Sequence, residues 1–302
     1  MPFPRILFPT DFSEAANEHL PYVQYILSHV KPDELCVLTV NRLSPSNTPV
    51  ERKTEDQLDF DAQTLERMSD DFDSRKDEYL SKLQREDESK VEFKQRHGKF
   101  VEVVKSEANN YQLLIMGTHG RGFVQAKLLG SNCSKIVSAV NIRCPILVIP
   151  THKISNLHIH KMVYATQLRN GKVDVQNLRK FLEFASYFHA KIVFVHVDKY
   201  YATNANESEK QGYLLQQRKQ EMVEKLQEQI DPHCPEHIKH KYCVLFDKSV
   251  ARSLTEYVRE KDVDLLALIK VKRSFISKLF HSSLTKNMSL SSHIPLMIFN
   301  QT

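Results

Sequence analysis

The chain repeats itself at a spacing of about 150 residues, and this repeat constrains the fold more than any other feature. Four apolar runs recur in the same order in both halves. Each run in the first half has a counterpart in the second: Arg5–Thr10 matches Lys161–Thr166, Cys36–Val40 matches Val193–Val197, Leu113–Met116 matches Leu265–Leu268, and Cys144–Ile149 matches Ile294–Phe299. A repeat this long indicates a duplicated domain rather than a solenoid unit. We expect domains at 1–150 and 161–302, joined by a linker at 151–160.

Within each half, apolar runs alternate with helical patterns, which favours a parallel sheet covered on both faces. In the first half, strands are expected at Arg5–Phe8, Glu34–Val40, Val91–Arg96, Leu113–Met116 and Pro145–Ile149. Helices are expected at roughly Ser13–Val30, Asp56–Gln84, Phe100–Asn109 and Ser131–Val140. Such sheets bind ligands at the carboxyl ends of their strands, where the strand order reverses.

Composition excludes several classes of protein. The net charge is only +5 and the basic residues are dispersed, so we expect no nucleic-acid partner. No apolar run approaches membrane-spanning length, and the first residues lack the apolar core of a signal peptide. The five cysteines are an odd number without framework spacing. Reduced thiols and a cytoplasmic location are therefore expected, with no membrane partner.

Four of the seven glycines lie between Gly117 and Gly130, directly after the apolar run Leu113–Met116. Glycine allows another molecule to approach the backbone closely. A loop that leaves a buried strand and enters a helix at Gly130-Ser131 presents backbone N–H groups to an anion. The sequence therefore predicts a phosphate-binding loop. It contains neither a P-loop nor a Gly-x-Gly-x-x-Gly motif after the first strand.

Asp11 follows the first strand, where a carboxylate can accept hydrogen bonds from ribose hydroxyls but would repel phosphates. The alternative is that Asp11 or Ser13 only caps the next helix. Ser131 and Asn132 can present N–H groups and a hydroxyl to phosphate while also serving as an ordinary helix start.

For three polar residues of this loop, a role in ligand binding or catalysis is less strongly indicated. Arg121 and Lys127 can neutralise phosphate charge, although solvent exposure is the more common state of a loop cation. His119 is a general-base candidate, but no partner accompanies it in the sequence, so catalysis by His119 is not expected.

The pattern Gly-x-x-Gly, nine residues, Gly-Ser resembles the ATP-binding signature of the universal stress protein family, and Gly117, Gly120, Gly130 and Ser131 fill it. Asp11 and the run Cys144–Val148 also match. The whole chain resembles a tandem universal stress protein. The resemblance implies an α/β fold of two tandem, doubly wound, five-stranded parallel-sheet domains that bind adenine nucleotides.

The resemblance further implies where ATP binds, usually with a divalent ion such as Mg²⁺ or Mn²⁺. Adenine would lie near Val40 and Met116, and ribose at Asp11. The complete expected set is Pro9, Thr10, Asp11, Val40, Met116, Gly117, His119, Gly120, Arg121, Gly130, Ser131 and Asn132. Family members mostly act as nucleotide-bound stress-response proteins, and many lack a defined reaction. The expected function is an ATP-binding stress-response or regulatory protein without catalytic residues. The alternatives are a slow ATPase or nucleotidyl-transfer enzyme using the same loop, and a scaffold that no longer uses nucleotide, which the intact loop disfavours.

The second half departs from the signature. Gln167 stands where the first half has Asp11, and Ile269–Ser274 replaces the start of the glycine loop without any glycine. Bulky and β-branched residues cannot fold as tightly around a triphosphate. We expect one nucleotide site per chain, in the first half.

A group of metal-ligand residue types lies in the second half: His233, Cys234, His237, His240 and Cys243. Their spacing matches no standard zinc pattern, and His240 and Cys243 would face opposite ways on a strand. A structural metal stays an alternative that we do not expect.

Each half ends in an apolar strand, Pro145–Ile149 or Pro295–Phe299, that would lie at a sheet edge. Bare apolar edges invite pairing. We predict that these two strands pair antiparallel within one chain. The sequence leaves open whether two chains associate further into a homodimer.

Overall fold

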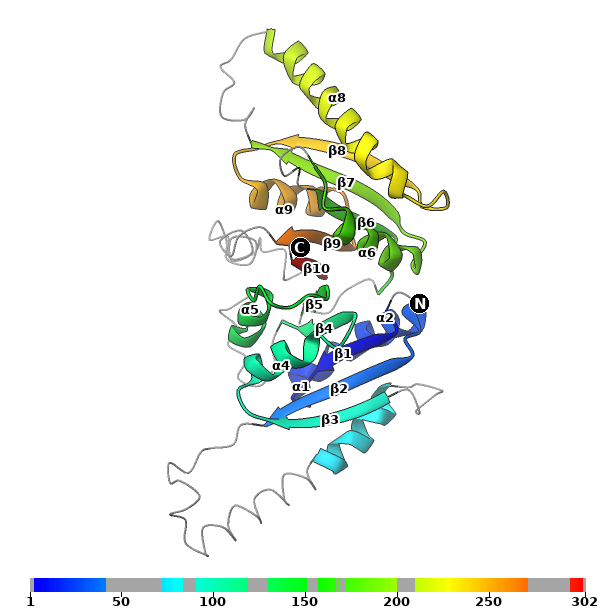
Figure 1. Ribbon diagram of the computed structural model, residues 1–302, viewed down its shortest axis with the longest axis vertical. Helices are drawn as coiled ribbons and strands as arrows, with labels where there is room; N and C mark the ends of the chain where they lie inside the picture. The colour runs from blue at the N-terminus through cyan, green and yellow to red at the C-terminus, as the bar shows by residue number, and fades with distance from the viewer. Residues whose placement is uncertain are drawn as a thin grey trace, which may run out of the picture.

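The computed structural model describes residues 3–41, 72–83, 91–118, 130–150, 157–166, 168, 172–199, 210–270 and 294–300. Both halves have the same architecture, in which helices cover the two faces of a parallel sheet (Figure 1). The first half contains β1 (Arg5–Pro9), α1 (Glu14–Asn17), α2 (Leu20–Val30), β2 (Glu34–Asn41), a helix at 72–83, β3 (Val91–His97), α4 (Phe100–Ala108), β4 (Leu113–Gly117), α5 (Ser131–Val137) and β5 (Ile146–Ile149). The second half contains β6 (Lys161–Thr166), α6 (Val175–Ser186), β7 (Lys191–Asp198), α8 (Lys210–Ile230), η3 (Asp231–His233), β8 (His240–Phe246), α9 (Val250–Glu260), β9 (Leu265–Lys270) and β10 (Leu296–Asn300).

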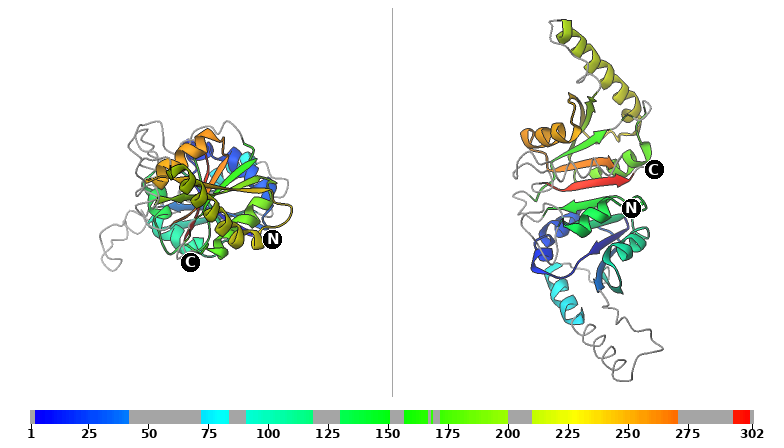
Figure 2. Two further views of the ribbon diagram at one scale, coloured as in Figure 1. Left: turned by 90° about the horizontal axis from the view of Figure 1, so that it is seen from above. Right: turned by 90° about the vertical axis from the view of Figure 1, so that its left-hand side faces the viewer.

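The strands of both halves form one sheet, in the order β3-β2-β1-β4-β5-β10-β9-β6-β7-β8. Figure 2 shows them stacked in a continuous row. All neighbours pair in parallel except β5 and β10, which are antiparallel and place Leu147 opposite Met297. The prediction that the two last strands pair within the chain is confirmed. Each apolar edge thereby covers the other.

In each half, the strand order reverses beside the first strand. The chain runs outward from β1 through β2 to β3 and then returns to β4 on the other side of β1. The second half repeats this order with β6 between β7 and β9. The crevice of the first half therefore lies at the carboxyl ends of β1 and β4, where doubly wound sheets bind ligands.

Alternate residues of each strand enter two different cores, because successive side chains point to opposite faces of a sheet. In β1, Ile6 and Phe8 pack in one core and Leu7 in the other. The first core also receives apolar residues of α2, α6, α8 and 72–83, and the second those of α4, α5 and α9. Each core contains residues of both halves, so the two domains are packed as one body.

One expected helix is divided. The pattern predicted a helix over Ser13–Val30, but the structure ends α1 at Asn17 and begins α2 at Leu20. Pro21 lies in the first turn of α2, where its missing N–H costs nothing. In a continuous helix the same proline would remove a backbone hydrogen bond and clash with the preceding turn. Of the expected helix at Asp56–Gln84, the described part is 72–83.

Two further observations bear on membrane insertion and on the state of the cysteines. No helix in the described ranges is long and apolar enough to cross a membrane. All five cysteines are free thiols, as the sequence predicted.

Candidate functional site

The turn after β1 is held by side chains of its own residues. Asp11 Oδ1 accepts hydrogen bonds from the Ser13 backbone N–H at 3.1 Å and from the Ser13 hydroxyl at 2.6 Å. Ser13 Oγ in turn accepts the Ala16 N–H at 3.2 Å and caps α1. The capping alternative is therefore correct for Ser13. Through this contact, Ser13 orients the Asp11 carboxylate at the carboxyl end of β1.

Phe12, in the middle of this turn, has a φ of 52°, in the left-handed region. That conformation costs an L-residue roughly 1–2 kcal/mol. Thr10 Oγ1 accepts the Phe12 N–H at 3.2 Å, and the Phe12 ring packs edge-on against Tyr79 with centroids 4.9 Å apart. These contacts hold the strained turn. No sequence pattern predicts this turn, because phenylalanine is not a residue that favours left-handed backbone.

Gly117 ends β4 and lies against the buried imidazole of His19. A Cβ at Gly117 would lie 2.6 Å from each ring nitrogen of His19, a distance that side chains do not tolerate. The first glycine of the signature is therefore required for packing within the protein. Thr118 follows, and its N–H bonds to the Ile149 carbonyl at 2.9 Å.

The two ends of the glycine loop meet. The Gly130 N–H donates to the Thr118 carbonyl at 2.8 Å, which brings the start of α5 to the end of β4. Gly130 is the N-cap of α5, with φ −59° and ψ 150°, a conformation open to any residue. A glycine at the N-cap supplies no side-chain oxygen to the N–H groups of the first turn. Ser131, exposed, and Asn132, half-buried, form that turn.

Val40 and Met116 lie near the carboxyl ends of β2 and β4 and pack against the same core. They therefore share the face of the sheet that α4 and α5 cover. Pro9 ends β1, and Thr10 follows it as a buried residue. The remaining expected site residues, His119, Gly120 and Arg121, lie outside the described residues, as does Lys127.

The corresponding edge of the second half is built from different residues. Lys270 ends β9, is 5% exposed, and donates from Nζ to the Ala139 carbonyl of the first half at 2.7 Å. At the end of β7, buried Asp198 pairs with Arg218 of α8 at 3.1 Å. His196 lies two residues earlier, and burial lowers its pKa. Gln167, which stands in place of Asp11, lies outside the described residues.

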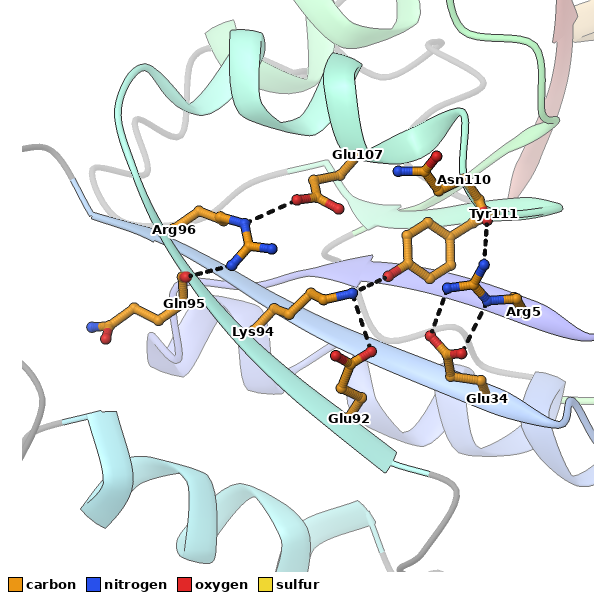
Figure 3. Close-up of polar contacts among 9 residues, drawn as sticks. All are labelled: Arg5, Glu34, Glu92, Lys94, Gln95, Arg96, Glu107, Asn110 and Tyr111. Atoms are coloured by element: carbon orange, nitrogen blue, oxygen red, sulfur yellow. Dashed lines mark hydrogen bonds and ion pairs between the residues drawn. The ribbon is translucent and has the colours of Figure 1, made fainter.

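A network of charged side chains runs from the amino-terminal ends of β1 and β2 along β3 to its carboxyl end, and no pattern in the sequence predicted it (Figure 3). Its contacts are Arg5–Glu34 at 2.9 Å, Lys94–Glu92 at 3.2 Å, Lys94 Nζ to the Tyr111 hydroxyl at 3.1 Å, and Arg96–Glu107 at 3.0 Å. Burial raises the pKa of the nearby Cys36 thiol to about 11 and that of Tyr111 to about 12. Neither group ionises near neutral pH, so this network joins strands and α4 rather than forming a reactive centre.

The histidine and cysteine residues of the second half do not converge. No three His, Cys, Asp or Glu side chains in the described ranges are placed to hold a metal ion. His240 Nε2 instead contacts Asp231 Oδ1 at 2.8 Å, and the Tyr242 hydroxyl donates to the same oxygen at 2.5 Å. Cys243 packs in the core on the other face of the sheet, as the alternation of the strand predicted.

Two solved structures that match nearly the whole chain share its fold. A universal stress protein from Archaeoglobus fulgidus DSM 4304 is 17% identical, with a TM-score of 0.66 and 99% of each chain covered. A functionally unknown protein from Pseudomonas aeruginosa PAO1 is 12% identical, with a TM-score of 0.58, covering 99% of this chain and 92% of its own. A universal stress protein solved in complex with cAMP is 14% identical over 50% of this chain and 99% of its own, with a TM-score of 0.34.

Comparison by sequence assigns the family. None of the curated proteins compared with the chain matches it significantly. The model of the universal stress protein family, by contrast, matches twice, at residues 2–150 and 161–300. These two matches account for nearly the whole sequence, so the chain belongs to the universal stress protein family and carries two of its domains in tandem.

Proposed function

We propose that this protein binds one ATP per chain, at the carboxyl ends of β1 and β4, and acts as a nucleotide-dependent stress-response or regulatory protein. One observation carries the proposal. Asp11 at the end of β1 and the start of α5 after β4 lie at the point where the strand order of the first half reverses. Doubly wound sheets bind nucleotides at this point.

The residues at this edge have the chemistry that ATP requires. The Asp11 carboxylate would accept hydrogen bonds from ribose hydroxyls, and the N–H groups of Ser131 and Asn132 would bind phosphate oxygens. Val40 and Met116 would contact adenine on the face that they share. A divalent ion, Mg²⁺ or Mn²⁺, would accompany the phosphates and neutralise part of their charge.

Gly130 is compatible with the proposal. Its φ and ψ do not require glycine. The absence of a side chain there leaves the backbone accessible to a ligand such as phosphate, as the proposal requires. Gly117, by contrast, is explained by His19 without any ligand.

The proposed role is binding rather than turnover. The described part of this edge offers Thr10, Asp11, Ser131 and Asn132, and the hydroxyl that is bonded to the Asp11 carboxylate, that of Ser13, serves as the N-cap of α1. Any ATP hydrolysis is expected to be slow and incidental. Replacing His119 by alanine tests this: selective loss of turnover with retained ATP binding would make His119 catalytic.

The second half is proposed to bind no nucleotide. Its β9 ends in Ile269 and Lys270 where the first half has Gly117 and Thr118, and the Lys270 ammonium is directed to Ala139. The second domain would then serve as the structural partner that covers the β5 edge.

The test is Gly130→Val in the full chain, with ATP binding measured by calorimetry. The backbone conformation at residue 130 accepts valine, so the variant should fold, and its side chain would fill the space for phosphate. The matched control is Gly212→Val on α8, where no atom lies within 4 Å of an added Cβ. ATP binding should vanish in the first variant and persist in the second. Undiminished binding in Gly130→Val would contradict the phosphate assignment.

A further inference from the structure

Three side chains of the second half donate hydrogen bonds to the segment that joins α5 to β5. The contacts are Lys270 Nζ to the Ala139 carbonyl at 2.7 Å, Asn300 Nδ2 to the Ile142 carbonyl at 2.5 Å, and Lys180 Nζ to the Arg143 carbonyl at 3.4 Å. These donors come from β9, β10 and α6. The segment that follows α5 is therefore held in place by the second domain.

The Lys270 contact differs from that of Lys180 in its burial. Lys270 and Ala139 are each 5% exposed, whereas the Lys180 contact lies on the surface. A hydrogen bond from an ammonium group is strong in such a dry environment, and removing the donor leaves a buried carbonyl unsatisfied. Lys270 thus attaches this segment to the second domain through a buried, charged donor, which Lys180 does not provide.

Lys270 donates to a carbonyl two residues after the last residue of α5. The Ala139 N–H bonds to the Ile136 carbonyl at 2.9 Å, so Ala139 closes the last turn of the helix. The carbonyl end of a helix carries partial negative charge, and a cation there stabilises it. The Lys270 ammonium of the second domain is bonded just beyond this end of the helix.

The other end of α5 lies at the candidate phosphate site. The helix has seven residues and is about 10 Å long. Cys133, Ile136 and Val137 are buried in the core, so the helix is packed along its length. Fixing its carboxyl end therefore also fixes the direction of the N–H groups of Ser131 and Asn132.

We propose that Lys270 is a positioning residue for phosphate binding, through which the second domain sets the nucleotide affinity of the first. The inference rests on the proposed ATP site. A helix already held in place needs no ordering when phosphate arrives, and preorganisation of this kind raises affinity. The lysine that stands where the first half has Thr118 would thereby hold α5 of the first half in place.

The experiment compares ATP and adenosine binding to the full-length wild type, Lys270→Met and Lys180→Met by calorimetry. Methionine keeps the length of the side chain but removes the donor and the charge. We expect Lys270→Met to weaken ATP binding about fivefold or more, a typical coupling between sites. Adenosine has no phosphate to contact α5, so its affinity should stay within about twofold, below that coupling range. Lys180→Met should leave both affinities unchanged.

The comparison of the two ligands separates positioning from a general loss of structure. Equal weakening of ATP and adenosine, or unchanged ATP binding in Lys270→Met, would overturn the coupling while leaving the ATP site intact. A wild type that binds no ATP would overturn the proposed function, and this inference with it. Circular dichroism checks the fold, and if Lys270→Met does not fold, Lys270→Gln takes its place under the same criteria.

Discussion

The imidazole of His19 occupies the space into which a side chain on Gly117 would project, with both ring nitrogens 2.6 Å from the position of its Cβ. His19 lies in the break between α1 and α2, and Gly117 ends β4. The first glycine of the loop signature is therefore tied to the helix break after β1. Packing therefore accounts for Gly117, whereas ligand binding is proposed for Gly130.

This contact predicts that Gly117→Ala destabilises the protein by roughly 1–3 kcal/mol, the usual cost of an overpacked core. The cause can be isolated with a double-mutant cycle measured by urea unfolding. In a His19→Ala background, most of the penalty of Gly117→Ala should disappear. An equal cost in both backgrounds would show that the imidazole is not what requires glycine.

Ser13 gives a second prediction, because its hydroxyl caps α1 and orients Asp11. Ser13→Ala should lower the free energy of unfolding by about 1 kcal/mol, the typical cost of losing an N-cap oxygen. Ser28→Ala is the matched control, since the Ser28 hydroxyl donates to the Tyr25 carbonyl on the surface. That change should stay within about 0.5 kcal/mol. Equal effects of the two substitutions would remove the capping role.

His196 predicts a pH dependence of stability. Burial lowers its pKa, while Asp198 raises it and Arg218 lowers it further. The folded protein therefore binds a proton at this site less readily than the unfolded chain. Stability is retained above the ordinary pKa of histidine, about 6.5, and falls as the pH drops through and below that value.

The measurement is urea unfolding at pH 7.5 and pH 5.5 for the wild type and for His196→Thr. Threonine does not titrate, and it is the residue that the first half carries at the matching place, Thr39. The loss of stability on acidification should be smaller in the variant. An equal or larger loss would assign the acid sensitivity to other groups.

Sequence reasoning located the strands well, because strands buried on both faces read as continuous apolar runs such as Leu113–Met116. The pairing of β5 with β10 also followed from local pattern, since both are apolar strands that end a half. The His19–Gly117 contact could not be foreseen, because it joins residues far apart in the chain. The left-handed turn at Phe12 was likewise hidden, because side-chain contacts from Thr10 and Tyr79 override the preference of the residue.

The shared sheet predicts the behaviour of the isolated first domain. In the full chain, Leu147 of β5 lies opposite Met297 of β10, so residues 1–150 alone would expose the apolar β5 edge. This fragment should dimerise or aggregate, which size-exclusion chromatography with light scattering can show. A stable, soluble monomer that binds ATP normally would mean that covering this edge is not the purpose of the second half.

The number of ATP molecules bound by the purified full-length protein decides whether each chain has a single adenine-nucleotide site. Isothermal titration calorimetry should give a stoichiometry of about one, and ATP at about 100 times its Kd should stabilise the protein by roughly 2.7 kcal/mol. A stoichiometry of two would contradict the proposal that the second half, whose Lys270 bonds to Ala139, binds no nucleotide. No binding at all would contradict the site at Asp11 and Gly130.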